Sequence, residues 1–396
     1  MKVLNKKILF LVILLSFGIS LMGVAWAAEA PIKIGVVQNL TGAWASIDGP
    51  CWNGIQLAID EINKAGGLLG RQVEAICIDT KADESEVVAA VTRLIEREKV
   101  SIIVGYCDTH WVLAAAPLAV ENNIPFITPG ATHPRIPERT DAWLACFGDN
   151  SQGAVLAEYA ITKENLKKVA VWVDTACDFS VAVCTYFVDA FKHFGGEVVY
   201  EDFYETDWTD YSTLVARLKA HQDTGKIDCV SPTGAIPGNV GLIVKQLREG
   251  GVTIPILGED GFDTPLLVEV GGKYAEGVLF VTHVSLSSPA PEVQGFVKNY
   301  KEKWGVEPEN AFAALGYDTV NLTAQAIKIV GSAEPAKIEE GLALVKDFPG
   351  VTGSITFAEG SKVPQKGVSV LVVKNGVFET LESMIPSYIP APEIAD

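Results

Sequence analysis

Four short polar segments of this sequence carry side chains that could bind or react with a small molecule. In the first, Thr109 follows an apolar run and precedes residues with helical spacing, so it would lie at the amino end of a helix. The first amides of a helix lack partners and carry partial positive charge, which favours an anion there. Thr109 could also simply cap its own helix. The segments are 105–111 (GYCDTHW), 128–134 (TPGATHP), 147–153 (FGDNSQG) and 258–261 (GEDG).

A catalytic role for the first segment would rest on Cys107 and His110 as nucleophile and base. Cysteine–histidine catalysis needs the two side chains within hydrogen-bond reach and a third group that orients the base. No GxSxG, HExxH or phosphate-binding loop motif occurs, and the five histidines do not have metal-ligand spacing. We therefore expect no enzyme, no catalytic residue, no metal and no cofactor.

An alternation of strands and helices positions these segments. Alternation of this kind is typical of an α/β fold with parallel sheets covered by helices. It falls into two series, before and after about residue 148, and ligands of such sheets bind beyond the carboxyl ends of the strands. The expected strands are 32–37, 73–78, 101–105, 125–128, 169–173, 197–200, 229–231 and 254–257. The expected helices are 53–65, 84–97, 111–121, 153–162, 181–194, 211–221 and 239–249.

Residues 1–27 have the pattern of an export signal. Three lysines precede an apolar run, and Ala25-Trp26-Ala27 is a small-x-small cleavage site without a lipid-accepting cysteine. We expect cleavage after Ala27 and a periplasmic or secreted protein, with a membrane anchor as the alternative. The net charge of -18 argues against nucleic acid as a partner.

The segment 32–73 (IKIGVVQNLTGAWASIDGPCWNGIQLAIDEINKAGGLLGRQV) resembles the opening of the Leu/Ile/Val-binding-protein family. The LTG loop, the NGxxLAxxxxN helix and the GGLLGRxV turn carry the resemblance, and the PGATxP turn at 129–134 continues it. Members of this family are extracytoplasmic receptors of ABC importers. The resemblance implies the type I periplasmic-binding-protein fold, with two doubly wound parallel-sheet lobes joined by a hinge that the chain crosses three times.

The same resemblance gives the domain boundaries. The signal peptide would be 1–27, the N-terminal lobe 28–147 plus 284–354, and the C-terminal lobe 148–283 plus 355–396. The crossings would fall near 146–149, 283–286 and 352–357, and helices 292–304 and 311–330 would return to the first lobe.

The resemblance also implies a clamp for an α-amino acid. Thr109 matches the family hydroxyl that holds the ligand carboxylate, and Gly130, Ala131 and Thr132 lie in the PGATxP turn, where Thr132 would add a second hydroxyl. Gly130 would let the backbone approach the ligand closely.

Two acids would complete that clamp. Asp149 matches the family aspartate that accepts from the ligand ammonium, and Asp260 matches an acid on the second lobe. Asp149 could instead cap the helix that starts near Gln152, and Asp260 could be a solvated acid in a turn.

Several positions depart from the family pattern and leave the ligand open. Trp44, His110 and Trp111 stand where relatives carry small residues; they could wall the pocket or stack on a planar ligand, or the tryptophans could fill space between helices. The family's Tyr-Gly is Phe179-Ser180 here, and a family tyrosine aligns near Ala235 or Ile236. Losing these phenols puts branched-chain specificity in doubt, so a smaller or flatter ligand is an alternative.

Seven cysteines leave at least one unpaired within the chain. Cys177 and Cys184 are close enough in sequence for a loop-to-helix bridge. The resemblance gives Cys107 half of a family disulfide, but Lys81 stands at the partner position. A four-cysteine zinc site is not expected, since there is no CxxC pair.

We therefore predict a non-catalytic solute-binding protein of an ABC importer. It would capture an amino acid or a related small polar solute by hinge closure, act as a monomer and contact a membrane permease transiently. The alternatives are urea or a short amide, a carboxylate without an amine, or a sensory role without transport.

Overall fold

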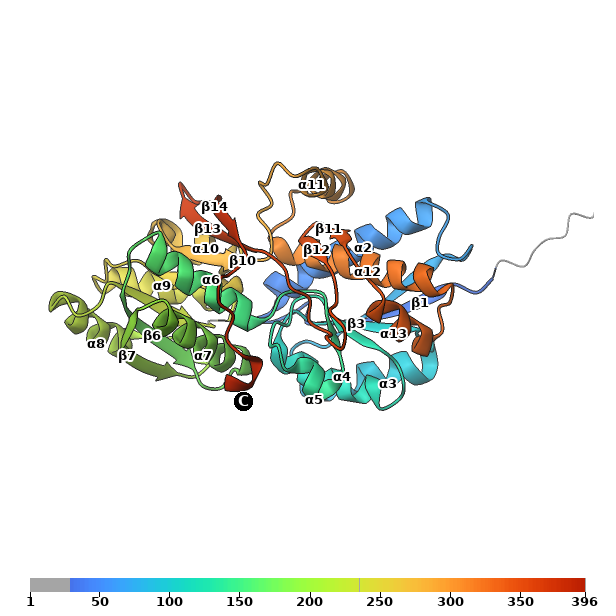
Figure 1. The fold of residues 1–396 in the computed structure, drawn as a ribbon, viewed down its shortest axis with the longest axis horizontal. Helices are drawn as coiled ribbons and strands as arrows, with labels where there is room; N and C mark the ends of the chain where they lie inside the picture. The colour runs from blue at the N-terminus through green and yellow to red at the C-terminus, as the bar shows by residue number, and fades with distance from the viewer. Residues whose placement is uncertain (1–28, 235, 396) are drawn as a thin grey trace, which may run out of the picture.

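Two lobes lie side by side in the computed structural model, which describes residues 29–234 and 236–395 (Figure 1). The expected signal peptide therefore lies outside the described residues. Within those two ranges, no helix has the length and apolar character needed to cross a membrane. Both lobes pair parallel strands with covering helices, so the predicted α/β class is confirmed.

The first lobe is built on a five-stranded sheet of order β2-β1-β3-β4-β5, parallel throughout. The buried runs Ile32–Gln38 and Ile102–Gly105 form its centre, as expected of strands covered on both faces. The strands are β1 (Ile32–Gln38), β2 (Val73–Asp79), β3 (Ile102–Gly105), β4 (Phe126–Thr128) and β5 (Trp143–Leu144). Its helices are α2 (Ala45–Lys64), α3 (Glu84–Arg93), α4 (Thr109–Val120), α5 (Ile136–Thr140), α11 (Pro291–Trp304), α12 (Ala311–Val330) and α13 (Pro335–Ala343).

The second lobe has a mixed sheet. One part has the order β7-β6-β8 and the other β14-β13-β10-β9, and a parallel bridge between Val230 and Ile256 joins them. β13 runs antiparallel to β10 and β14. The strand pattern did not predict this antiparallel part of the sheet. The strands are β6 (Lys168–Asp174), β7 (Glu197–Tyr204), β8 (Cys229–Thr233), β9 (Leu257–Gly258), β10 (Leu279–Thr282), β13 (Val368–Lys374) and β14 (Val377–Met384). Its helices are α6 (Asp149–Thr162), α7 (Asp178–His193), α8 (Ser212–Asp223), α9 (Val240–Glu249) and α10 (Leu266–Gly271).

Helix α2 begins at Ala45, earlier than the predicted residue 53, although Pro50 lies inside it. Proline has no amide hydrogen, so the carbonyl of Ser46 loses its helical partner. The side-chain Nδ2 of Asn310 donates to that carbonyl at 2.8 Å. A residue next to α12 thus replaces the hydrogen bond that Pro50 cannot make.

The chain crosses between the lobes three times, and the third crossing lies later than predicted. Phe357 packs in the core of the first lobe, and Leu144 N still donates to Lys362 O at 3.0 Å. The chain reaches the second lobe only at β13, so residues 355–363 belong with the first lobe rather than the second. The small hairpin of β11 (Phe348–Gly350) and β12 (Gly353–Ile355) precedes this crossing.

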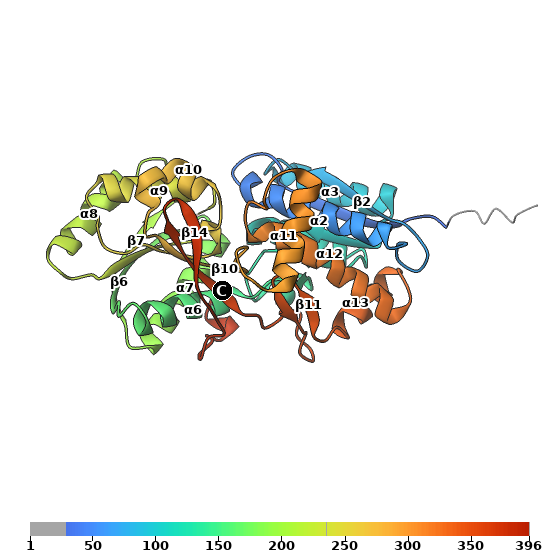
Figure 2. The ribbon, with the colours of Figure 1, turned by 90° about the horizontal axis from the view of Figure 1, so that it is seen from above.

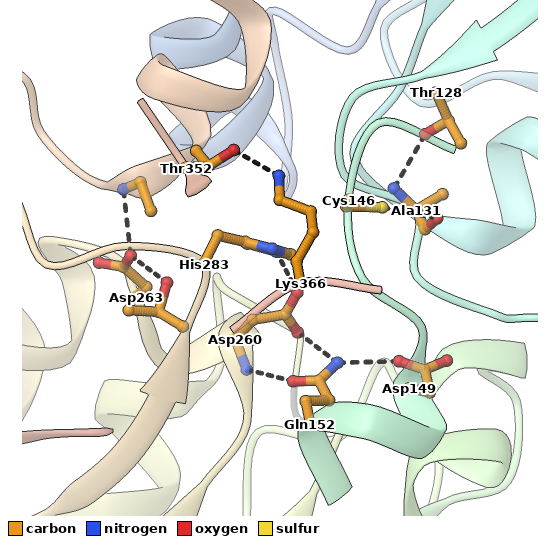
Figure 3. A network of polar contacts seen from close by, with 12 residues as sticks. Thr128, Ala131, Cys146, Asp149, Gln152, Asp260, Asp263, His283, Thr352 and Lys366 are labelled. Atoms are coloured by element: carbon orange, nitrogen blue, oxygen red, sulfur yellow. Dashed lines mark hydrogen bonds and ion pairs between the residues drawn. The ribbon is translucent and has the colours of Figure 1, made fainter. Parts of the chain in front are cut away.

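A buried lysine joins the crossings (Figure 3). The ammonium of Lys366 donates to Ala145 O at 3.0 Å, beside the first crossing, and to the hydroxyl of Thr352. Thr352 in turn donates from its amide and hydroxyl to the carboxyl of Asp318, at 2.8 and 2.6 Å. Burial lowers the pKa of Lys366, and the charge of Asp318 opposes that shift.

Two glycines let α2 and α12 pack backbone to backbone, where Figure 2 shows them side by side. A Cβ on Gly54 would lie 1.9 Å from Ala313 O, and one on Gly316 would lie 2.1 Å from Cys51 O. Gly49, in the same helix α2, has nothing within 4 Å of its Cβ position.

We expect Gly54→Ala to destabilise the protein by about 3 kcal/mol, because the helices must separate to admit the methyl group. Gly49→Ala should raise the free energy of unfolding by about 0.5–1 kcal/mol, since alanine has the higher helix propensity. Urea unfolding of the two variants measures both changes. Equal effects of the two substitutions would contradict this account of the packing.

Candidate functional site

A small cavity lies between the two lobes. Its empty volume, counted together with the part that is open to solvent, is about 310 Å³. The first lobe provides Ile47, Cys107, Asp108, Thr109, Thr132 and Phe312, and the second provides Phe179, Ile236, Pro237, Asp260 and Gly261.

The lobes are closed on this cavity. Ala43 and Trp44 of the first lobe pack against an apolar cluster of the second lobe that contains Phe179 and Ile236. Asp263, on the second lobe, accepts from the amide of Ala311 at 3.0 Å and so bonds the first turn of the first-lobe helix α12. Separating Trp44 from this cluster would expose its apolar side chains.

Thr109 lies on the cavity wall, at the first position of α4. The cap of this helix is Asp108, whose Oδ1 accepts from His110 N at 3.0 Å. Thr109 therefore does not cap its own helix. Its hydroxyl is fully buried and has no hydrogen-bond partner among the residues that the structure describes.

The PGATxP turn holds Thr132 against the cavity. The amide of Ala131 donates to Thr128 Oγ1 at 2.9 Å, and that hydroxyl donates to Tyr106 O at 2.8 Å. A Cβ at Gly130 would lie 3.0 Å from the Phe312 ring, so glycine allows this ring to reach the cavity. Gly130 and Ala131 support the turn, whereas Thr132 lines the cavity itself.

Asp149 and Asp260 are joined by Gln152, a residue that was not predicted to belong to the site (Figure 3). Gln152 Nε2 donates to Asp149 Oδ1 at 2.8 Å and to Asp260 Oδ1 at 3.1 Å, and its Oε1 accepts from Asp260 N at 3.0 Å. The ring Nε2 of His283 lies 2.9 Å from Asp260 Oδ2. Asp260 is thus a buried acid of the cavity lining that is hydrogen-bonded to Gln152 and His283, and it is not a solvated turn acid.

Asp149 lies behind that wall, outside the cavity lining. It is the first residue of α6 after the cap Gly148, and it makes no side-chain cap bond. Its Oδ2 has no hydrogen-bond partner within the described chain. Burial, and then the charge of Asp260, raise the pKa of Asp149 well above its usual range, while the nearby Thr132 hydroxyl lowers it.

The remaining predicted residues divide between the cavity and its surroundings. Phe179 and Ile236 line the cavity, and Ala235 lies outside the described residues. Trp44 and Trp111 lie outside the lining and pack edge to face, with ring centroids 5.4 Å apart, and Trp44 also packs across the lobes against the cluster that contains Phe179.

His110 lies outside the cavity lining, and its ring lies near acids on two helices. Its Nε2 lies 3.2 Å from Glu84 Oε1, at the start of α3, and its Nδ1 lies 3.8 Å from Asp178 Oδ2, at the start of α7 on the other lobe. Asp178, and then the charges of Asp108 and Glu84, raise the pKa of His110.

The cysteines do not support catalysis or a disulfide. Burial raises the pKa of Cys107 well above that of a free thiol, and His110 is directed at its acidic neighbours instead. All seven cysteines are free. Cys177 caps α7 and Cys184 lies two turns further along it, about 10 Å by helical rise, which is beyond disulfide reach. The predicted bridge between them is therefore wrong.

Sequence reasoning missed several residues of the lining. Ile47 lies in the early part of α2 and Phe312 in the first turn of α12, and the segment patterns gave no sign that either would reach the cleft. Asp108 and Gly261 stand directly beside the predicted Thr109 and Asp260, so adjacency was a usable signal for them.

Comparison with known proteins identifies the family. A family model described as "Periplasmic binding protein" matches residues 31–377. The chain belongs to this family. Its members are solute-binding proteins and not enzymes, so the expectation of a non-catalytic protein is confirmed.

Solved structures of the family share the fold over most of their length. A leucine-binding protein from Thermotoga maritima is 34% identical with a TM-score of 0.83, covering 90% of this chain and 99% of its own. A branched-chain amino-acid transporter substrate-binding protein from Streptococcus pneumoniae, solved with isoleucine, is 31% identical with a TM-score of 0.82, covering 90% and 100%. A solute-binding protein of an ABC transporter from Rhodopseudomonas palustris, solved with 3,4-dihydroxybenzoic acid, is 26% identical with a TM-score of 0.80, covering 91% and 99%.

Glu259, next to Asp260, gives this region a pH-dependent stability. Burial raises its pKa from 4.5 to about 8, although Gly234 N donates to its Oε2 at 3.0 Å. Because the folded protein holds this proton more tightly than the unfolded chain, stability is lost as the pH rises from about 4.5 to 8.

We expect Glu259→Gln to raise the free energy of unfolding by about 1–3 kcal/mol at pH values above 8, because the variant buries no charge. The difference should shrink steadily as the pH falls to about 4.5. Urea unfolding across this pH range measures it. Parallel pH profiles for the two proteins would show that the carboxyl of Glu259 is not the source.

Proposed function

We propose that this protein is the extracytoplasmic binding component of an ABC importer, acting as a monomer in the periplasm. It would capture a small polar solute that carries an amine, by closure of the two lobes. The observation that carries the proposal is the cavity between the lobes, whose lining includes the buried acid Asp260. The relatives solved with isoleucine and with an aromatic acid support this role.

The acids of the second lobe favour an amine over an aromatic carboxylate as the group that they bind. Asp260 faces the cavity, and Asp149 stands behind it with one oxygen unpartnered within the described chain. An ammonium at this wall would offset the charge of Asp260 and oppose the two causes that raise the pKa of Asp149, whereas a second anion would add to the repulsion. Amino acids and short amino compounds remain in the proposed class; a carboxylate without an amine is the less favoured candidate.

Closure couples binding to transport in this proposal. The bond between Asp263 and Ala311 and the pair His110–Asp178 join the two lobes in this closed form. A ligand that touches both walls stabilises the closed state by its additional contacts. The permease would then recognise the closed form.

We expect Asp260→Asn to lower the affinity for an amine-bearing ligand by about 30- to several-thousand-fold. Losing one partner of a buried charge pair typically costs about 2–5 kcal/mol. The mature protein is unfolded and refolded to remove bound solute. A thermal-shift screen of amino acids and their decarboxylated, deaminated and amidated analogues then finds ligands, and calorimetry measures affinities.

Glu259→Gln is the matched control, because Glu259 is the adjacent buried acid and its carboxyl faces Gly234 rather than the cavity. Its affinity should stay within about threefold of the wild type. Responses confined to deaminated acids, or an unchanged affinity in Asp260→Asn, would overturn the proposed function.

A further inference from the structure

The helix end that faces the cavity from the first lobe already contains an anion. Asp108 caps α4, with its Oδ1 accepting from His110 N at 3.0 Å. It is only 7% exposed and lines the cavity beside Thr109. The partial positive charge that a helix start offers to a ligand carboxylate is therefore balanced by a carboxyl of the chain itself.

No positive charge of the lining offsets Asp108. The cavity wall contains two acids, Asp108 and Asp260, one from each lobe, and no lysine, arginine or histidine among its described residues. His110 is the basic group next to Asp108, but its ring is shared between Glu84 and Asp178. The group of Glu84, Asp178, Asp108 and His110 has a net negative charge even when the His110 ring is protonated, because three acids then face one cation.

Asp108 also keeps its charge near neutral pH. Burial raises the pKa of Asp108 to about 6, while His110 opposes this shift and Asp178 adds to it. The group is therefore mostly ionised at about pH 7. A ligand carboxylate at Thr109 would have to lie beside this charge in a closed cavity, where like charges repel strongly.

We propose that Asp108 is a specificity-determining residue that rejects a free carboxylate, so that the ligand has hydrogen-bond donors at both ends, as an amino amide or a small diamine does. This rests on the proposed function, in which Asp260 binds the amine. One end of the ligand meets Asp260, and the other presents N–H groups to Asp108 and to the unpartnered hydroxyl of Thr109. The apolar walls between them come from Ile47, Phe312 and Phe179.

The test uses pairs of compounds that differ only at the carboxyl end. Calorimetry on the refolded mature protein near pH 7 compares glycine with glycinamide, L-alanine with L-alaninamide and L-leucine with L-leucinamide, and adds putrescine as a diamine. We expect at least one amide, or putrescine, to bind about tenfold or more tightly than any of the three acids.

Asp108→Asn removes the charge and keeps a good helix cap. It should reduce the preference for the amide about tenfold or reverse it. Asp83→Asn is the matched control, because Asp83 caps α3 in the same way, accepting from Ser85 N at 2.8 Å, but lies outside the cavity. It should keep the wild-type preference.

Acids that bind as tightly as their amides, or a preference that Asp108→Asn leaves unchanged, would overturn the inference. So would the absence of binding by every compound of the panel to both wild type and Asp108→Asn. If acids bind and Asp260→Asn abolishes that binding, the proposed function stands and only the role of Asp108 fails. If Asp260→Asn has no effect on binding, the proposed function fails as well.

Discussion

Carboxyl groups that are buried between two lobes must be hydrogen-bonded or protonated, and much of this site is arranged to meet that requirement. Asp260 is bonded at both oxygens and at its amide, through Gln152 and His283. Asp263 bonds the hydroxyl of Thr282 at 2.6 Å and the first amide of α12. Each of these acids ties together elements that are distant in sequence. The loop after β9 is thereby fixed at the cavity.

The hydrogen bonding of the buried acid Asp260 also links the site to the hinge, through His283. His283 begins the second crossing, and its ring stacks on Phe147 of the first crossing with centroids 4.0 Å apart. Lys366, on the third crossing, bonds Ala145 and Thr352, beside the carboxyl of Asp318. The first crossing therefore contacts the second through stacked rings and the third through the bonds of Lys366.

The fold was largely predictable from the sequence because its signals are local. Apolar runs such as Ile32–Gln38, turn residues and helical periodicity each depend on neighbouring residues. The errors arose where distant contacts decide. The bond that lets α2 pass through Pro50 comes from Asn310, 264 residues away from its acceptor Ser46. The late third crossing depends on Phe357 packing in the first-lobe core.

The candidate site was predictable to the level of segments but not of side-chain directions. All four polar segments reach the junction of the lobes, and Thr109, Thr132 and Asp260 line the cavity. The direction of His110 depends on Glu84 and Asp178 from two other helices, and the role of Gln152 depends on Asp260, 108 residues away. The importance of Asp108 appears only when the cavity wall is complete. A clamp for an amino acid would place the ligand carboxylate at the start of α4, where the carboxyl of Asp108 already lies.

A crystal structure of the mature protein, purified without unfolding so that it keeps its own solute, tests the central claim most directly. We expect a small molecule in the cavity, with a nitrogen within hydrogen-bond distance of the Asp260 carboxyl, about 2.7–3.2 Å, and a donor group facing Asp108 and Thr109. A solute whose carboxylate lies against Asp260, or one bound outside the cavity with the lobes closed, would contradict it.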